Sequence, residues 1–325
     1  MNTAAVSLNH LSKTYADGKK AVNNILISLA PGEIFGFLGP NGAGKTTTVK
    51  LLNGILTPTE GSCSVYGTDP AVHPEKTHAL SGVVTEHAQM YDHLTGMENL
   101  LFYGSLFGLQ TAACTRRSLF LLEQMDLTGA KDKKLAAYST GMRKRLSLAR
   151  ALNHQPKVLF LAEPTSGLDP QSAQNVHAII QNLPKEQGIT VFLCTHQLRY
   201  AQEICTRYGL IREGSLLAQG TLEELRKKSC SGMTVKIRAA GITTILPSMY
   251  PDQKSTMAAF QPEPGKPDHQ PAEYLIHVQS EAEIPQLVRK ILENGGETYH
   301  VSSGQPSLEE LYFTLTDKQA SSVQD

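Results

Sequence analysis

The chain has 325 residues with 40% hydrophobic content, so it can fold into one large domain and a smaller one rather than stay disordered. Thirty basic residues balance thirty acidic ones, which excludes a global field that would attract nucleic acid or an anionic membrane surface. No run approaches the roughly 18 apolar residues of a membrane span, and the N-terminus lacks the basic start and apolar core of a secretion signal, so we expect neither.

The first part of the chain predicts two antiparallel strands followed by a buried one. The segments Val6–Tyr15 and Ala21–Ile27 have strand patterns and are separated by an Asp17-Gly18 turn, which favours a hairpin over a βαβ unit. A short apolar strand, Glu33–Leu38, follows and runs directly into a glycine-rich segment.

That segment, GPNGAGKT, satisfies the phosphate-loop pattern in full, and it lies between the predicted strand and a helical apolar spacing at 49, 52 and 55. Its glycines let backbone N–H groups surround a phosphate, while the helix N-terminus adds positive potential. Lys45 would reach the β- and γ-phosphates of a nucleotide, and the Thr46 hydroxyl would bind Mg²⁺. The predicted nucleotide-binding residues of this loop are Gly39, Asn41, Gly42, Ala43, Gly44, Lys45, Thr46 and Thr47.

A mostly helical block is expected between this loop and the next buried strand. After a strand at Ser81–Thr85, Thr95 and Glu98 have capping-box spacing ahead of an apolar run. Helical patterns continue through SLFLLEQM and MRKRLSLARALN.

Two further apolar strands end in polar residues. The stretch KVLFLAEPTSGLDP has a strand at Val158–Leu161 followed by one carboxylate, Glu163, with Ala162 immediately before it. A second strand, Ile189–Thr195, ends in His196. A helix, a strand at 208–211 and a helix start at 221–224 complete this part of the chain.

Beyond residue 228 the pattern changes to that of a small α+β domain, 229–325. Strands are expected at MTVKIR and EYLIHV, and helices at EAEIPQLVRKILENGG and SLEELYFTLT. The segment QPEPGKPDHQP at 261–271 predicts a mobile loop, because its prolines and glycine preclude regular structure. The five cysteines are scattered without a CxxC pair, which predicts reduced thiols that serve as packing residues.

Four motifs, GPNGAGKTT, YSTGMRKRLSLARAL, LFLAEPTSGLD and CTH, resemble in order and spacing those of the nucleotide-binding ATPase subunit of an ABC transporter. The resemblance covers about residues 5–228, and the C-terminal region is similar to the accessory tail of the drug- and antibiotic-exporting branch. It implies an α/β fold for 1–228: a phosphate-loop ATPase core, an antiparallel β subdomain and a helical subdomain inserted at about 87–155. It also implies that two such domains pack head to tail, with ATP and Mg²⁺ between them.

The resemblance assigns roles to residues outside the loop. Tyr15 occupies the position of the adenine-stacking aromatic, although a strand packing residue would also fit. His196 falls where the family's switch histidine senses the γ-phosphate, whereas an isolated histidine at a strand end is often structural. Ser139, Gly141 and Met142 stand in the signature, which reads STGM where the family has Ser-Gly-Gly-Gln, and would contact the γ-phosphate of the partner's nucleotide.

The single carboxylate after Val158–Leu161 departs from the family pattern. Glu163 holds the position of the glutamate that polarises the attacking water, but Ala162 replaces the aspartate that holds Mg²⁺. Glu86 stands where most relatives have glutamine, and its carboxylate can bind Mg²⁺ or accept from water. Asp169 would face the opposite subunit. Natural degeneration and an engineered change both fit Ala162.

We therefore expect a cytoplasmic ATPase, peripheral on the inner face of the cell membrane, that powers export by a separate transmembrane permease and pairs with a second nucleotide-binding subunit. The alternative is a degenerate or engineered ATP-binding module with impaired hydrolysis. The soluble ABC ATPases of translation or DNA repair are disfavoured, because the chain has one phosphate loop and no long coiled-coil insertion, and we expect no nucleic-acid partner. A GTPase is disfavoured because no NKxD motif is present.

Overall fold

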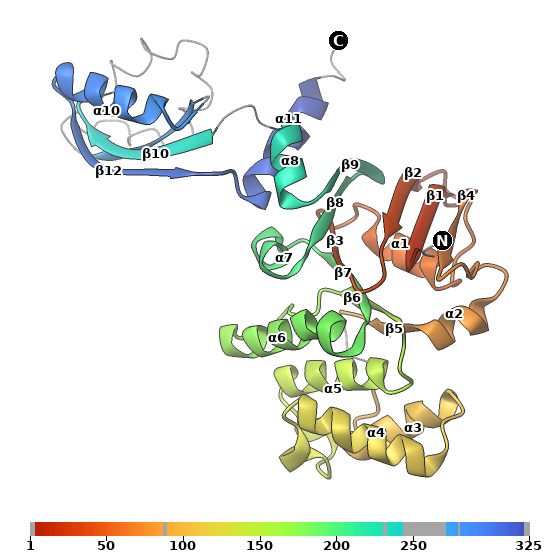
Figure 1. The fold of residues 1–325 in the computed structure, drawn as a ribbon. Helices are drawn as coiled ribbons and strands as arrows, with labels where there is room; N and C mark the ends of the chain where they lie inside the picture. The colour runs from red at the N-terminus through yellow and green to blue at the C-terminus, as the bar shows by residue number, and fades with distance from the viewer. Residues whose placement is uncertain (1–3, 87–89, 230–232, 243–270, 279, 322–325) are drawn as a thin grey trace. The chain divides into compact units, whose positions relative to one another are not determined.

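The computed structural model describes residues 4–86, 90–229, 233–242, 271–278 and 280–321 (Figure 1). The chain divides into two compact units, Met1–Leu222 and Glu223–Asp325. Helix α8 (Leu222–Ser229) falls largely in the second unit, because Arg226 donates to the Pro306 carbonyl and to Gln305 Oε1. The first unit thus ends at Leu222. The domain boundary at 228/229 stays a prediction.

An antiparallel sheet opens the first unit, and its strands are β1 (Val6–Thr14), β2 (Lys20–Leu29) and β4 (Glu60–Val65) in the order β2-β1-β4. The antiparallel pairing of the first two strands is confirmed, with Gly18 in the turn at φ 82°. The sequence analysis did not predict β4, because EGSCSV is polar; it forms a strand by pairing with β1.

A second sheet of six strands forms the core of this unit, in the order β5-β6-β7-β3-β8-β9. The first five of these are parallel and β9 is antiparallel to β8. Their side chains at the centre are almost wholly buried, and Phe35, Phe37 and Phe160 pack around Phe192. The strands are β3 (Ile34–Leu38), β5 (Ser81–Val84), β6 (Val158–Ala162), β7 (Thr190–Thr195), β8 (Arg207–Arg212) and β9 (Ser215–Gly220).

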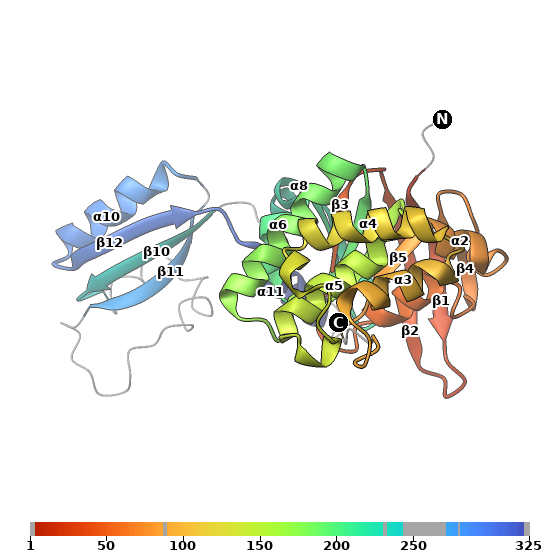
Figure 2. The ribbon, with the colours of Figure 1, turned by 90° about the horizontal axis from the view of Figure 1, so that it is seen from below.

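Helices flank these sheets, and the three helices α3, α4 and α5 pack together between β5 and β6 in the chain (Figures 1 and 2). The capping box at the start of α3 is confirmed: Thr95 Oγ1 accepts from the Glu98 amide and the Glu98 carboxylate accepts from the Thr95 amide. The helices are α1 (Lys45–Leu52), α2 (Pro74–Leu80), α3 (Gly96–Leu106), α4 (Thr111–Gln124), α5 (Thr140–Leu152), α6 (Pro170–Gln187) and α7 (Leu198–Ile204), with short 3₁₀ turns η1 (Thr128–Ala130) and η2 (Leu135–Ala137). Within the described ranges, no helix is both long and apolar enough to cross a membrane.

The second unit is a three-stranded antiparallel sheet with helices, in the strand order β11-β10-β12. Leu287 and Ile291 of α10 are buried in one apolar cluster with residues of the sheet. The loop expected at 261–271 lies, except for Pro271, outside the described residues. The elements are β10 (Met233–Ala240), β11 (Ala272–Val278), α10 (Glu283–Glu293), β12 (Glu297–Gly304) and α11 (Leu308–Ser321).

Candidate nucleotide-binding site

One cavity of about 740 Å³ lies in the first unit, where the glycine-rich loop meets the ends of β5, β6 and β7. It brings together residues that are far apart in the sequence and that come from both sheets. The predicted site residues among its lining are Tyr15, Asn41, Gly42, Ala43, Gly44, Lys45, Thr46, Thr47, Glu86 and Glu163. The cavity is large enough for a nucleotide, as ligand sites of this size commonly are.

The loop has this shape because glycines occupy its constrained positions. Gly42 and Gly44 have φ values of 82° and 109°, in the left-handed region that favours glycine. A Cβ on Gly44 would lie 2.3 Å from the Ala21 carbonyl, so a side chain cannot fit there. Helix α1 then begins at Lys45 without a side-chain cap, and its first N–H groups are therefore available to an anion.

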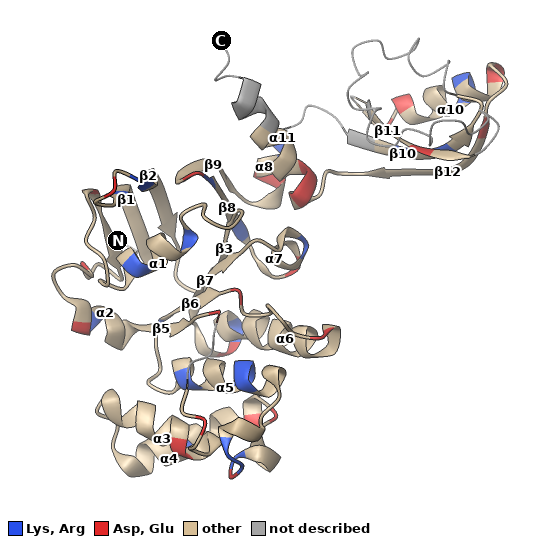
Figure 3. Ribbon diagram, turned by 180° about the vertical axis from the view of Figure 1, so that it is seen from behind, with Lys and Arg blue, Asp and Glu red and all other residues tan. Residues whose placement is uncertain are grey.

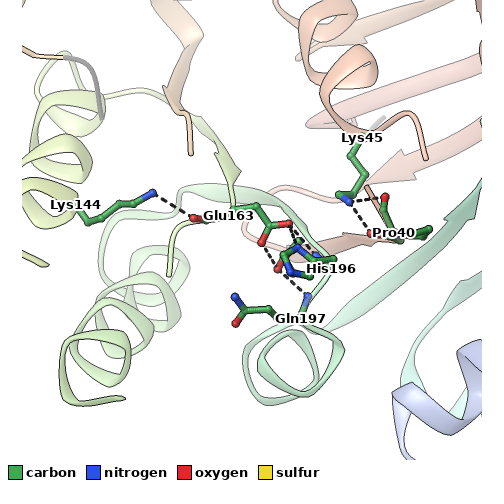
Figure 4. Close-up of polar contacts among 8 residues, drawn as sticks. Pro40, Lys45, Lys144, Glu163, His196 and Gln197 are labelled. Atoms are coloured by element: carbon green, nitrogen blue, oxygen red, sulfur yellow. Dashed lines mark hydrogen bonds and ion pairs between the residues drawn. The ribbon is translucent and has the colours of Figure 1, made fainter. Parts of the chain in front are cut away.

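Lys45 is 8% exposed, and its ammonium group lies over the loop. Lys45 Nζ donates to the carbonyl oxygens of Gly39 at 2.5 Å and Pro40 at 3.0 Å (Figure 4). Burial lowers the pKa of Lys45, and the negative charge of Glu163 opposes this shift. The charge of Lys45 is thus only partly compensated within the protein, as suits a group that binds phosphate.

Gly39 has a different role from the other loop glycines. A Cβ at this position would lie 2.1 Å from the Ile211 carbonyl of β8, and Gly39 is not among the residues found to line the cavity. Close packing against β8 therefore accounts for glycine here.

Glu163, directly after β6, is 8% exposed and is held by three hydrogen bonds (Figure 4). Its Oε2 accepts from the Thr195 hydroxyl at 2.7 Å, and its Oε1 accepts from the His196 amide at 2.9 Å. His196 Nδ1 lies 2.7 Å from the same Oε1. The parallel strands β6 and β7 end at one edge of the sheet, which is why these residues meet.

Ala162 gives the edge of β6 a methyl group where the family pattern has a carboxylate. It pairs in register with Cys194 of β7, and both residues line the cavity. Burial raises the pKa of Cys194 to about 12, so its thiol is protonated near neutral pH and does not replace a carboxylate.

The donor set suits a nucleotide better than a bare metal ion. The described part of the chain has no group of three or more His, Cys, Asp and Glu residues that could hold a metal. Thr46 and Glu86 are exposed and line the cavity, so each can offer an oxygen ligand. An Mg²⁺ ion here would need phosphate oxygens and water to complete its shell.

Tyr15 lies at the edge of the cavity and contacts the loop. Its hydroxyl oxygen is 3.2 Å from Thr47 Oγ1, which links β1 to the start of α1. The cavity is also lined by residues that the sequence analysis did not select: Lys19, Ala21, Lys50, Thr85 and Cys194. Of these, only Lys19 and Lys50 could have been selected from the sequence, because cationic side chains near a phosphate loop attract anions.

The signature residues and Asp169 are not among the cavity's lining residues. Ser139 caps α5 by accepting from the Met142 amide at 3.3 Å. Asp169 caps α6 in the same way, and its hydrogen bonds with Ser172 lower its pKa. A Cβ on Gly141 would lie 2.8 Å from Ser172 Oγ, so the two helix starts are in close contact.

The comparisons with known proteins agree with this architecture. The sequence profile of the ABC transporter family matches residues 22–166. A cbiO1 structure from Clostridium perfringens, described as part of the ABC transporter complex cbiONQ, has a TM-score of 0.64 at 26% identity and covers 76% of this chain and 97% of its own. A structure described as the ATP binding subunit of an ABC transporter has a TM-score of 0.62 at 27% identity, covering 69% and 92%. Fold and site thus define an ABC-type ATPase.

Relatives of known sequence define the subgroup. Daunorubicin resistance ATP-binding protein DrrA3 of Streptomyces coeruleorubidus is 33% identical, with 97% of each chain covered. Linearmycin resistance ATP-binding protein LnrL of Bacillus subtilis is 34% identical, with 72% of this chain and 74% of LnrL covered. The chain belongs to the ATP-binding subunits of ABC transporters, of the drug-resistance type. The predicted family and mixed α/β fold are confirmed; members of the family hydrolyse ATP, generally with Mg²⁺.

Proposed function

We propose that this chain powers export through a separate membrane-spanning partner, with ATP bound between two head-to-tail copies of its nucleotide-binding unit or between it and a similar subunit. The observation that carries this proposal is that the cavity and the signature helix start at Ser139 are separate within one chain. Each presents helix N–H groups that favour an anion. A second subunit would bring a signature to the open side of the nucleotide.

The residues of the cavity fit the chemistry of ATP hydrolysis. Lys45 would exchange the carbonyls of Gly39 and Pro40 for phosphate oxygens, and Thr46 and Glu86 would hold Mg²⁺, which neutralises phosphate charge when bound. Glu163 would accept a proton from the attacking water at Oε2, since this oxygen accepts one hydrogen bond, from Thr195, and has a second lone pair. His196, Tyr15 and the signature residues keep their predicted roles in this scheme.

The surface between α3, β5 and α5 supports docking of a membrane partner. A cavity of about 730 Å³ lies there and extends to α2; it is separate from the nucleotide cavity, and apolar and aromatic residues share its lining with polar and charged ones such as Glu75 and Arg150. Ile55 and Leu106 in its wall are 67% and 66% exposed, and Tyr103 packs with Phe102 at its edge. Such exposure is atypical of core packing residues and typical of a docking surface. Docking here would place the chain at the inner face of the membrane.

A second candidate is a degenerate ATP-binding module with impaired hydrolysis. The observation that favours it is the methyl group of Ala162 at the edge of β6. The two candidates differ in turnover and not in nucleotide binding, so a measured rate of phosphate release separates them.

The partner is tested by co-purification from cells that naturally produce this protein. The full chain should retain a membrane-spanning protein, and Leu106→Glu should reduce its recovery at least about tenfold, because a charge cannot be buried at the contact without a large cost. Leu119→Glu is the matched control, since Leu119 is an exposed leucine of α4 outside the cavity lining. Equal recovery of the partner with both variants would contradict docking at this surface.

A further inference from the structure

Lys144 is a buried cation on the signature helix that no predicted role includes. It is 5% exposed, whereas long charged side chains are almost never fully buried unless they are paired. Basic residues recur along α5 (Figure 3). Lys144 differs from its neighbours in what it contacts.

The ammonium group of Lys144 donates to two main-chain carbonyl oxygens. One belongs to Glu86, two residues after the end of β5. The other belongs to Glu163, directly after β6, at 3.3 Å (Figure 4). Burial lowers the pKa of Lys144, and the negative charges of Glu86 and Glu163 oppose this shift. One buried side chain thus connects the ends of two neighbouring parallel strands.

The conformation of Glu163 makes this contact significant. Glu163 has a φ of 47°, a left-handed value that is uncommon for residues other than glycine and that persists only where the surroundings hold it. Its amide donates to the Cys194 carbonyl at 2.9 Å, and its carbonyl accepts from Lys144 and from the Ser166 amide. Lys144 therefore helps to hold the backbone from which the Glu163 carboxylate projects.

Glu86 is the other end of this connection. Its side chain is exposed and lines the nucleotide cavity, and it stands five residues before Tyr91, which packs against Phe102 of α3. A displacement of the Glu86 main chain would therefore displace the Glu163 main chain through Lys144. A displacement of α5 would displace both.

We propose that Lys144 is a positioning residue that couples the main chain at Glu86 to the catalytic carboxylate of Glu163. The inference rests on the proposed function, because it assumes that ATP binds in the cavity that both glutamates line. Lys144 itself does not touch the nucleotide in this proposal; it sets the relative position of two strand ends.

A fluorescence experiment tests the coupling without turnover. The chain has no tryptophan, so Tyr91→Trp introduces a single indole beside the Glu86 segment. Saturating Mg-ATP should change the emission of the full chain, with a midpoint equal to the calorimetric Kd. When Lys144→Met is added to Tyr91→Trp, the Kd for Mg-ATP should stay within about threefold of its value in Tyr91→Trp alone. The ATP-dependent emission change should fall at least about fivefold. Lys144→Arg should restore it.

Arg145→Met is the matched control, because Arg145 also donates from α5 to main-chain carbonyls, those of Met125 and Asp126. It should keep the ATP-dependent emission change. Three outcomes would each overturn the inference: an unchanged emission response in Lys144→Met, a lost response in Arg145→Met, or no response in the Tyr91→Trp parent. Absence of calorimetric ATP binding by the parent would instead overturn the proposed function. If Lys144→Met does not fold, Lys144→Gln, which keeps a donor without the charge, replaces it.

Discussion

Lys45 illustrates how a single buried charge defines the site. Its ammonium group donates to the carbonyl oxygens of Gly39 and Pro40, and burial lowers its pKa. A bound anion would offset the free-energy cost of burying the Lys45 charge. We therefore expect the phosphates of ATP to bind to this group. Lys45→Ala should weaken ATP binding at least about 30-fold, the cost of about 2 kcal/mol for a charged hydrogen bond.

Isothermal titration of ATP into both proteins measures this effect. Lys157→Ala is the control, since Lys157 lies at the start of β6 and contacts the Tyr66 ring instead of the cavity. Equal affinity of the Lys45→Ala and parent proteins would remove the basis for this site.

Ala162 is the residue for which the sequence departs most clearly from its family. Without an acid at this position, Mg²⁺ depends on Thr46, Glu86, water and the nucleotide phosphates, so we expect it to be held less firmly. Hydrolysis by the protein with Ala162 should be slow and should require a raised Mg²⁺ concentration. Ala162→Asp should raise turnover by roughly 10²-fold or more, because phosphoryl transfer relies on positioning and charge stabilisation.

Steady-state phosphate release against Mg²⁺ concentration tests this prediction, with Glu163→Gln in each background as the inactive control. Ala162→Asp should not alter ATP affinity by a comparable factor, since the loop contacts remain. Parent turnover as fast as that of Ala162→Asp at low Mg²⁺ would show that another ligand replaces the aspartate.

Among the elements, α3 depends on its N-terminal capping box. Thr95 and Glu98 each accept the other's amide hydrogen, and Asn99 Nδ2 donates to the carbonyls around the start of the helix. Thr95→Ala should lower the free energy of unfolding by about 1 kcal/mol, as the loss of an N-cap usually does. Urea unfolding followed by circular dichroism measures the loss. Thr115→Ala, a change at a half-buried threonine within α4 that does not cap the helix, should cost less; an equal cost would rule out a capping effect.

The same cap predicts a pH dependence. Hydrogen bonds from the Thr95 amide and side chain hold the pKa of Glu98 below its ordinary value. A carboxylate with a lowered pKa stabilises the fold above its unfolded pKa, and this contribution is lost as pH falls through the folded pKa. The melting temperature of Glu98→Gln should therefore fall less between pH 6 and pH 3 than that of the parent. Parallel curves would indicate that Glu98 is not linked to stability.

At the scale of the whole molecule, the separation of Ser139 from the nucleotide cavity supports the proposed second subunit. Chains with Asn41→Cys, beside Gly42 but without its positive φ, and chains with Ser139→Cys, mixed, should crosslink when ATP is present and much less without it. The natural cysteines that the structure describes, Cys63, Cys114, Cys194 and Cys205, are buried and free, which limits competing reactions. Chains with Asp132→Cys, paired with Asn41→Cys, serve as the exposed control. Crosslinking that does not respond to nucleotide would contradict the head-to-tail arrangement.

Local sequence signals were sufficient for much of this protein. The phosphate loop, the capping box at Thr95 and the apolar strands around Phe160 and Phe192 each depend on neighbours within a few residues, and the structure contains all of them. The same applies to the hairpin turn at Asp17-Gly18, since glycine there adopts a positive φ. Periodicity and turn chemistry determine such features before any tertiary contact is known.

Only the tertiary structure decided which distant groups meet. Strands β4 and β12 are polar or mostly exposed and became strands through pairing with β1 and β10. Lys144 reached the Glu86 and Glu163 carbonyls, and His196 reached the Glu163 carboxylate, because parallel strands end at one edge of the sheet. A sequence pattern records the chemistry of each residue and its near neighbours, whereas the register of the strands sets the distances between them.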